Sequence, residues 1–404
     1  MEIKALLGVK VLDFGWAIAG SLTGKYLGDF GAQVVKVESS KRLDLFRTTR
    51  QGKRSINNPD DRPDFVSINT SKYGITINLK HPRANEVINK LICWADIVNE
   101  NFTPGTMAKL GIDFEHAKKI NPAIIMIGGS LFGQTGPLTS EWGVDGTGAA
   151  LSGHYFLSGW ADRDPIGTRL TYGDNLFPLI NVTAVVAALD YKRRTGKGQY
   201  IDSSMLEVWT HKISPATIDW QVNKHLESRN GNRIPYAAPH GVFPCIGDDR
   251  WCAIAVFTDG EWQAFCQAIG SPDLIKNPRF LTLDLRKENE NELEKLVSEW
   301  TRSHSAEEVM QIMQAAGVPA GAVQDVKDLL ENDPQLKERE FLVPLKHPVM
   351  GTLHHSRAPF KLSNTKARVS NAPCLGEHTE YVCTQLLGMS SDEFLSLFQD
   401  GVFD

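Results

Sequence analysis

Short apolar runs alternate with amphipathic stretches over the first half of the chain. Runs rich in valine, isoleucine and leucine predict five strands, at residues 8–14, 33–39, 74–79, 95–102 and 122–128. Stretches with helical periodicity, such as residues 81–94, separate them. This alternation predicts a largely parallel α/β sheet with helices on both faces. Such a sheet binds ligands beyond the carboxyl ends of its strands.

Residues 176–191 are apolar nearly all round, which predicts a buried helix. This is the longest apolar run in the chain, yet it is too short to span a bilayer and is bounded by Asp174 and Asp190. The string TGKGQYID at residues 195–202 follows and predicts a turn.

The pattern changes at residues 225–240, where a polar stretch with glycines and prolines predicts a domain boundary. Residues 241–257 predict a hairpin around Gly247, Asp248 and Asp249. Helices are expected next, at residues 260–269, 288–303 and 305–316, the last starting with a capping-box pair, Ser305 and Glu308. Residues 340–363 are strand-like again, and residues 377–399 are helical.

These patterns predict three parts. A large α/β domain is expected at residues 1–225, a smaller α+β domain at 226–330, and a C-terminal segment that returns to the large domain at 331–404.

Composition narrows the function. A chain of 404 residues with a net charge of −5 is unsuited to nucleic acid as its main partner. Its six cysteines contain no CxxC pair, which favours reduced thiols in the cytoplasm, and the N-terminus lacks the apolar core of a signal peptide. Apart from the adjacent His354 and His355, which would face opposite ways on a strand, the eleven histidines form no ligand pair, so we expect no metal. The short apolar run leads us to expect no membrane partner.

The turn after the first strand, VLDFGWAIAG, is similar to the start of a dinucleotide-binding fold, with Glu38 near the place of a ribose-binding acid. However, Gly15 and Gly20 do not complete G-x-G-x-x-G, which argues against an NAD-dependent dehydrogenase. Basic residues follow the predicted strand ends: Lys41, Arg42, Arg47, Lys72 and Lys109. Each alone is typical of a solvated surface, whereas together they could bind a phosphate-rich ligand.

Asp174 follows a glycine and opens the long apolar helix. An aspartate there can be an N-cap, or its carboxylate can be a nucleophile in acyl transfer, and the two uses are compatible. The N–H groups of a helix start are expected to keep such a carboxylate ionised.

Many strings match one family in the same order. They include GVKVLDFGWAIAG, GAQVVKVES, SINTSKYGITINLKHP, ADIVNENFTPGTMAKLGIDF, GGSLFGQTGP, GTRLTYGD, TGKGQYIDSSMLE, AGVPAGAV, NDPQLKER and APCLGEHT. On these strings the chain resembles the class III CoA-transferases, the group of the formyl-CoA, carnitine and benzylsuccinate CoA-transferases. The resemblance covers nearly the whole chain.

The resemblance implies that Asp174 attacks an acyl-CoA thioester and forms first an aspartyl anhydride and then an aspartyl-CoA thioester. It implies no tightly bound cofactor, with the CoA thioester as substrate. The CoA-binding residues that it implies are Ala17, Ala19, Glu38, Lys41, Arg42, Asn69, Lys72, Asn101, Phe102 and Lys109. It also implies a large Rossmann-like domain, a small domain and an interlocked dimer.

The chain departs from the family in its first turn, where Ile18 stands in place of a glutamine that some members carry. It also lacks the glycine run that some members carry in the small domain. We therefore expect the substrate acid to be bulkier or more apolar than in those members, in a pocket lined by Trp16 and Tyr236.

The nearest rival is an α-methylacyl-CoA racemase, whose acid/base pair is a histidine and an aspartate. Here the histidine position reads Val144, between Gly143 and Asp145, which argues against racemisation. A subunit of a heteromeric transferase is a second alternative. Succinyl-CoA is the expected donor and an aromatic, benzylsuccinate-like acid the expected acceptor.

Overall fold

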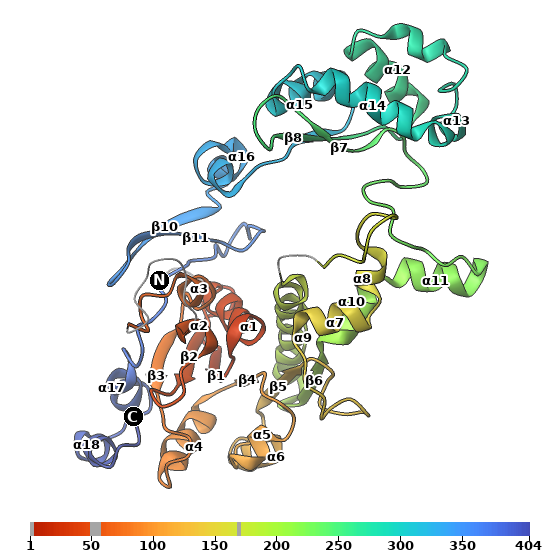
Figure 1. Ribbon diagram of the computed structural model, residues 1–404. Helices are drawn as coiled ribbons and strands as arrows, with labels where there is room; N and C mark the ends of the chain where they lie inside the picture. The colour runs from red at the N-terminus through yellow and green to blue at the C-terminus, as the bar shows by residue number, and fades with distance from the viewer. Residues whose placement is uncertain (1–3, 49–57, 168–170) are drawn as a thin grey trace. The chain divides into compact units, whose positions relative to one another are not determined.

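The computed structural model describes residues 4–48, 58–167 and 171–404 (Figure 1). Residues 168–170, within the string GTRLTYGD, lie outside this part. The chain divides into two compact units. Unit 1 contains residues 1–154, 168–223 and 335–404, and unit 2 contains residues 155–167 and 224–334. The division near residues 223 and 334 lies close to the predicted boundaries, but the three-part domain scheme stays a prediction.

Unit 1 is built on a six-stranded parallel sheet with the order β3-β2-β1-β4-β5-β6. Its strands are β1 (Lys10–Asp13), β2 (Gln33–Glu38), β3 (Tyr73–Thr76), β4 (Ile97–Glu100), β5 (Ile125–Ser130) and β6 (Tyr200–Ser204). This is the strand order of dinucleotide-binding folds, whose direction of winding reverses between β1 and β4. The predicted parallel α/β sheet is therefore confirmed.

The helices of unit 1 connect and cover these strands. They are α1 (Ala17–Asp29), α2 (Leu45–Thr48), α3 (Pro63–Ile68), α4 (Ala84–Trp94), α5 (Thr106–Lys109), α6 (Phe114–Ile120), α7 (Asp145–Leu151), α9 (Tyr172–Thr195), α10 (Met205–Lys212) and α11 (Ser214–Asn223). Helix α8 (His154–Leu157) lies where the two units divide.

The two faces of the sheet carry separate cores because successive side chains of a strand point to opposite faces. Val11 and Val34 pack with residues of α1 and α9 on one face. Leu12 and Val35 pack with residues of α4 and of the C-terminal helices on the other. The sheet is therefore covered on both sides, as a parallel sheet requires.

The C-terminal part of unit 1 packs against the sheet. It contains α16 (Pro334–Glu338), the antiparallel hairpin of β10 (Leu342–His347) and β11 (Gly351–Ser356), then α17 (Thr379–Tyr381), η3 (Val382–Leu386) and α18 (Ser391–Gln399). The predicted single helix at residues 377–399 is thus divided. On the hairpin, His355 is buried, whereas His354 is exposed.

Unit 2 packs helices against an antiparallel sheet of β7 (His240–Pro244), β8 (Trp251–Ala255) and β9 (Ala320–Ala322). Its helices are α12 (Asp259–Ala268), η1 (Pro272–Lys276), α13 (Leu283–Glu288), α14 (Glu290–Thr301), α15 (Ala306–Ala315) and η2 (Asp328–Asn332). The predicted hairpin and the capping box that opens α15 are both confirmed.

The segment 155–167 is held in unit 2 by contacts with residues far along the chain. The Gly231 N–H donates to the carbonyl of Gly159 at 2.7 Å, and the Arg229 side chain donates to the carbonyl of Arg163 at 2.8 Å. A Cβ at Gly231 would overlap the ring of Trp160, so glycine is required there.

Two predictions for unit 1 were wrong. Residues 200–204 form the edge strand β6, where only a turn was expected, because the partly polar run still pairs with β5. Helix α9 is buried on one face only: Val185 is fully buried, whereas Leu179, Ile180 and Val186 are exposed. The predicted helix therefore exists, but the chain alone does not cover it.

Helix α9 is also longer than the apolar run suggested. In the described part of the chain it is the one helix that is long and apolar enough to suit a membrane span: it has 24 residues, and an 18-residue window within it has a mean hydropathy of 1.2. However, it packs against α1 and β5, and Asn181 accepts a 2.7 Å hydrogen bond from Ser203 of β6. These contacts are typical of a core helix, which passes the same test of length and composition.

We expect the capping box of α15 to contribute measurably to the stability of unit 2. Ser305→Ala removes the oxygen that accepts the Glu308 N–H at 3.2 Å, and should lower the free energy of unfolding by about 1 kcal/mol. Ser298→Ala, inside α14, should be neutral or stabilising because alanine is the better helix former. Urea unfolding followed by circular dichroism compares the two, and equal losses would contradict the prediction.

Candidate active site

Asp174 lies in the first turn of α9. The N-cap of this helix is Thr171, so Asp174 does not occupy the N-cap position, which was one of the two uses left open for it. Because α9 joins two parallel strands, β5 and β6, it runs against them, and its N-terminus lies at the carboxyl edge of the sheet. Asp174 therefore stands at the edge where such sheets bind ligands.

Asp145, the first residue of α7, holds the start of α9 in place. Its Oδ1 accepts the N–H of Asp174 at 3.0 Å and the indole N–H of Trp209 at 3.2 Å. A Cβ at Gly173 would lie 2.3 Å from that Oδ1 and 2.2 Å from the indole nitrogen, so only glycine fits. Asp145 and Trp209 thus fix the backbone that carries Asp174.

The two carboxyl groups change each other's chemistry. Burial, together with the neighbouring charge of Asp145, raises the pKa of Asp174 to about 7. Burial also raises the pKa of Asp145, while the N–H groups that it accepts oppose this. The direction of this shift is opposite to the expectation that the helix start keeps Asp174 ionised.

Several predicted residues meet in the turn after β1. The Trp16 N–H donates to Asn101 Oδ1 at 2.7 Å, and Asn101 Nδ2 donates back to the Trp16 carbonyl at 3.0 Å. The rings of Trp16 and Phe102 meet edge to face at 5.9 Å, and the guanidinium of Arg42 lies 5.0 Å from the Trp16 ring centre. Ala17, Ile18 and Ala19 follow in α1. This cluster also lies at the carboxyl edge, between β1 and β4.

Other predicted residues lie beneath the surface. Lys72 is buried, and its ammonium donates to Asp13, to the carbonyl of Ser21 and to Asn69, at 2.7–2.8 Å. Burial lowers the pKa of Lys72 to about 8, while Asp13 opposes this. In this arrangement Asn69 and Lys72 brace α1 from below, and a direct contact with CoA stays a prediction.

Glu38 is also occupied. Its carboxylate accepts two hydrogen bonds from the buried guanidinium of Arg47, at 2.7 and 2.8 Å. The predicted basic cluster is therefore divided: Arg47 is an internal ion-pair partner, whereas Lys41, Arg42 and Lys109 have exposed side chains. Only the exposed ones can reach a phosphate in this conformation.

The remaining predicted residues are spread out. Val144 is exposed beside Asp145. Tyr236 belongs to unit 2, where it stacks on Phe257 at 6.4 Å and is 62% exposed, so the structure does not group it with the residues of unit 1. Within the described residues, no group of three or more His, Cys, Asp or Glu side chains is arranged to hold a metal ion.

Three supporting residues were not predicted from the sequence. Trp209 donates to Asp145 below Asp174, and Lys36 and Asp44 bind the backbone of the turn after β1. No motif identified them, because a buried charge or indole has no pattern of its own along the chain. The one available signal was indirect: Asp44 follows the exposed basic pair by two residues and precedes a short helix, where aspartate is a favoured cap.

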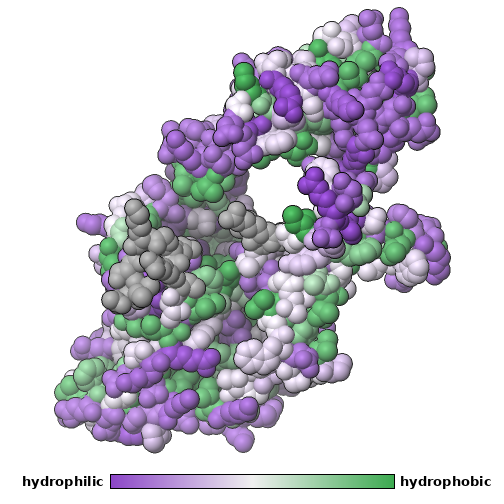
Figure 2. Space-filling view, in the orientation of Figure 1, coloured by the Kyte–Doolittle hydropathy of each residue, from purple (hydrophilic) through white to green (hydrophobic). Residues whose placement is uncertain are grey.

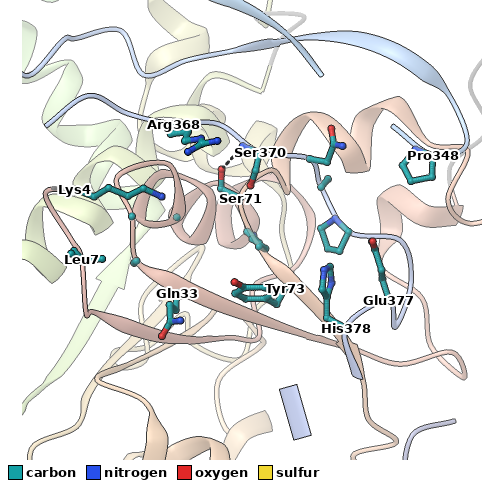
Figure 3. Close-up of a pocket in the computed structure, with 17 residues that line it drawn as sticks. Lys4, Leu7, Gln33, Ser71, Tyr73, Pro348, Arg368, Ser370, Glu377 and His378 are labelled. Atoms are coloured by element: carbon teal, nitrogen blue, oxygen red, sulfur yellow. Dashed lines mark hydrogen bonds between the residues drawn. The ribbon is translucent and has the colours of Figure 1, made fainter. Parts of the chain in front are cut away.

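A large cavity of about 640 Å³ lies elsewhere in unit 1 (Figure 3). Gln33 and Tyr73, the first residues of β2 and β3, form part of its lining, together with Arg368 and His378 of the returning segment. It therefore opens at the amino edge of the sheet, opposite to Asp174. Lys72 is its one predicted site residue among the lining residues that the structure describes.

Comparison with known proteins identifies the family and the fold. The family described as CoA-transferase family III matches residues 6–379. The chain belongs to this family. The class III CoA-transferase expected from the motifs is confirmed, and the protein is an enzyme of this class that uses CoA thioesters as substrates.

Relatives with named activities cover nearly the full length. This CoA-transferase is 32% identical over 398 residues to succinyl-CoA–D-citramalate CoA-transferase of Chloroflexus aurantiacus, covering 98% of the chain and 97% of the relative. It is 31% identical over 399 residues to the beta subunit of succinyl-CoA–L-malate CoA-transferase of the same organism, covering 97% and 96%. A crystal structure of a CAIB/BAIF family protein from Brucella suis matches with a TM-score of 0.85 and 29% identity, over 95% of this chain and 99% of that one.

The charge of Asp145 should set the ionisation of Asp174. In Asp145→Asn the amide oxygen can still accept the Asp174 N–H, but the negative charge is gone, so the pKa of Asp174 should fall below 7. Carbon-13 NMR of selectively labelled aspartate carboxyl groups would follow the titration, with Asp174→Asn to assign the signal. An unchanged midpoint in Asp145→Asn would show that the repulsion is negligible.

Proposed function

We propose that this CoA-transferase moves CoA from succinyl-CoA to a second carboxylic acid, with Asp174 as the nucleophile. The observation that carries the proposal is a carboxyl group at the carboxyl edge of the sheet, on a backbone fixed by Asp145 and Trp209. A fixed nucleophile lowers the barrier because its orientation is set before the substrate arrives.

The steps balance without any outside reactant. The ionised carboxylate of Asp174 attacks the thioester carbonyl, the C–S bond breaks, and CoA leaves as thiolate from a mixed anhydride. The thiolate then attacks the aspartyl carbonyl and releases succinate, which leaves an aspartyl-CoA thioester. The acceptor carboxylate attacks this thioester, and the returning thiolate attacks the acceptor's carbonyl in the new anhydride. Thioester is exchanged for thioester, so no ATP is consumed.

The burial that raises the pKa of Asp174 also prepares it for attack. A carboxylate in a desolvated site has few water molecules to lose before it reaches the carbonyl carbon. The cost is that about half of the free enzyme is protonated at neutral pH, since the pKa is about 7. We therefore infer that kcat/KM rises with pH through neutrality.

CoA is proposed to lie along the turn after β1. The exposed guanidinium of Arg42 suits a phosphate, and the rings of Trp16 and Phe102 suit the adenine. Lys41 and Lys109 are further exposed cations that follow β2 and β4. These side chains support the site because they share the carboxyl edge with Asp174.

The two relatives named above support succinyl-CoA as the donor, since both names include it. The acceptors in those names, D-citramalate and L-malate, are hydroxylated dicarboxylic acids, and they are the first acceptors to test. An aromatic, benzylsuccinate-like acceptor stays a prediction from sequence. One panel that contains all three acids decides between them.

Asp174→Ala should lower turnover by roughly three orders of magnitude or more, because no covalent intermediate can form. The matched control is Asp190→Ala, at the exposed far end of the same helix, which should keep its activity. Mass spectrometry after incubation with succinyl-CoA and trapping with hydroxylamine should find the modification on the peptide that carries Asp174. Substantial turnover in Asp174→Ala would refute the nucleophile, and Cα deuterium exchange in heavy water would then point to racemase chemistry.

We further infer that α9 and α11 form a subunit interface, in line with the interlocked dimer that the resemblance implies. None of the residues of α11, all of them described, is buried, and Ile218 and Val222 are strongly exposed. Figure 2 shows hydrophobic residues at the surface of unit 1. The exposed face of α9, with Ile180 and Val186, adds to this apolar area. An unpartnered apolar surface of this kind supports burial against another subunit.

Light scattering should give the purified chain a mass of twice its 44.8 kDa. Ile180→Asp should convert it to a monomer because the carboxylate would be buried without a partner. Leu395→Asp, on the exposed face of α18, should leave the mass unchanged. A monomeric wild type would contradict the homodimer and favour a heteromer with a related subunit, as one relative's name implies for that relative.

A further inference from the structure

The turn between β1 and α1 has a backbone conformation that its sequence does not favour. Ala17 has a φ of 50°, in the left-handed region that residues with a Cβ rarely adopt. Such a conformation persists only where the surroundings hold it. The neighbouring contacts show what holds it.

Asp44 holds the turn from the side of β2. Its Oδ2 accepts the N–H of Ala17 at 3.2 Å, and its Oδ1 accepts the N–H of Phe46 at 2.9 Å. The Asp44 side chain is fully buried, with the ammonium of Lys36 at 3.7 Å. The carboxylate therefore links the turn to α2 and cannot itself reach a ligand at the surface.

Lys36 and Asn101 hold the same turn from two other directions. The ammonium of Lys36 donates to the carbonyl of Gly15 at 2.5 Å. Asn101 exchanges two hydrogen bonds with the backbone of Trp16, as described above. Three consecutive residues of the turn are thus fixed by side chains from β2, from the residue after β4 and from the segment before α2.

The turn so fixed leads into the start of α1, where the Asp44 carboxylate already accepts the N–H of Ala17. In this fully described stretch the side chain of the N-cap Trp16 makes no capping hydrogen bond, and the first turn of α1 itself contains no acidic residue. The N–H groups of a helix start, with the positive end of the helix dipole, favour an anionic ligand. Their direction depends on the backbone of Ala17, which precedes them.

We propose that Asp44 is a positioning residue for CoA: it keeps Ala17 left-handed, so that the start of α1 and the Trp16 ring present one fixed surface to the CoA phosphates. This rests on the proposed placement of CoA along the turn. Asp44 acts through Ala17 and does not touch CoA. Removing its carboxylate lets Ala17 relax toward negative φ and misplaces those groups.

Isothermal titration with free coenzyme A and the KM for succinyl-CoA test the proposal. Asp44→Ala should weaken CoA binding by about tenfold, which corresponds to the free-energy cost of holding an alanine in the left-handed region. The kcat should change by less than about threefold. Adding Ala17→Gly should restore the affinity to within about threefold of the wild type, because glycine adopts positive φ without strain. A merely structural role would not respond to this second change.

The matched control is Asp29→Ala, which removes another buried carboxylate with a lysine partner, Lys25, at the far end of α1. It should lower thermal stability and leave the affinity for CoA unchanged. Wild-type affinity in Asp44→Ala, or no recovery with Ala17→Gly, would overturn the proposal. Unchanged CoA binding in both Trp16→Ala and Phe102→Ala is a different result, because it would refute the placement of CoA itself.

If Asp44→Ala does not fold, Ala17→Val tests the same inference in the intact network. A β-branched residue resists the left-handed region more strongly than alanine, so CoA binding should again weaken by about tenfold. Unchanged binding in Ala17→Val would overturn the proposal.

Discussion

A buried ion pair between Asp13 and Lys72 connects the parts of unit 1 that carry the site. The ammonium of Lys72 lies 2.8 Å from Asp13 Oδ2, and the other oxygen of Asp13 accepts hydrogen bonds from Asn99 and from the N–H of Gly15. The strands β1 and β4 and the residue before β3 are thereby joined to the turn that begins α1. A buried charge pair is tolerated only when its remaining donors and acceptors are satisfied, and these are. The hydrogen bonds of Asp13 and Lys72 therefore fix the backbone of the turn.

Removing a charged side chain from water has a different outcome at Lys72 and at Asp174. Lys72 is buried beside a partner of opposite charge, whereas Asp174 is half-buried beside a second carboxyl group. The first arrangement stabilises the fold. The second raises the pKa of Asp174. In the mechanism proposed above, the charge of Asp174 disappears when its carboxylate becomes an anhydride or a thioester, so the proposed intermediate relieves the repulsion by Asp145.

The sequence pattern was informative where a residue's role repeats along the chain. Alternating apolar runs located five parallel strands of unit 1, and the spacing of Ser305 and Glu308 located the start of α15. It failed for β6, whose mixed polar residues suit a half-exposed edge, and for the exposed side of α9, since periodicity cannot reveal what covers a helix. Charges were misjudged for a related reason. From the sequence alone, Arg47 and Lys72 are expected to be solvated. Only the three-dimensional fold shows that each is buried beside a carboxylate, Glu38 and Asp13 respectively. Asp174 was located by its place at the start of the apolar helix, and its expected role as nucleophile came from the resemblance. Its raised pKa depends on neighbours that only the folded chain supplies.

The chain passes between its two units four times, at residues 154, 167, 223 and 334. Unit 2 therefore cannot be excised as one continuous fragment. A piece cut from residue 224 to 334 would lack the carbonyl of Gly159 and the ring of Trp160, and it would expose the backbone at Gly231 that they cover. Exchange of small domains between members of this family, as a route to new acceptor acids, thus requires two splices in register: one for the long segment and one for the short excursion at 155–167.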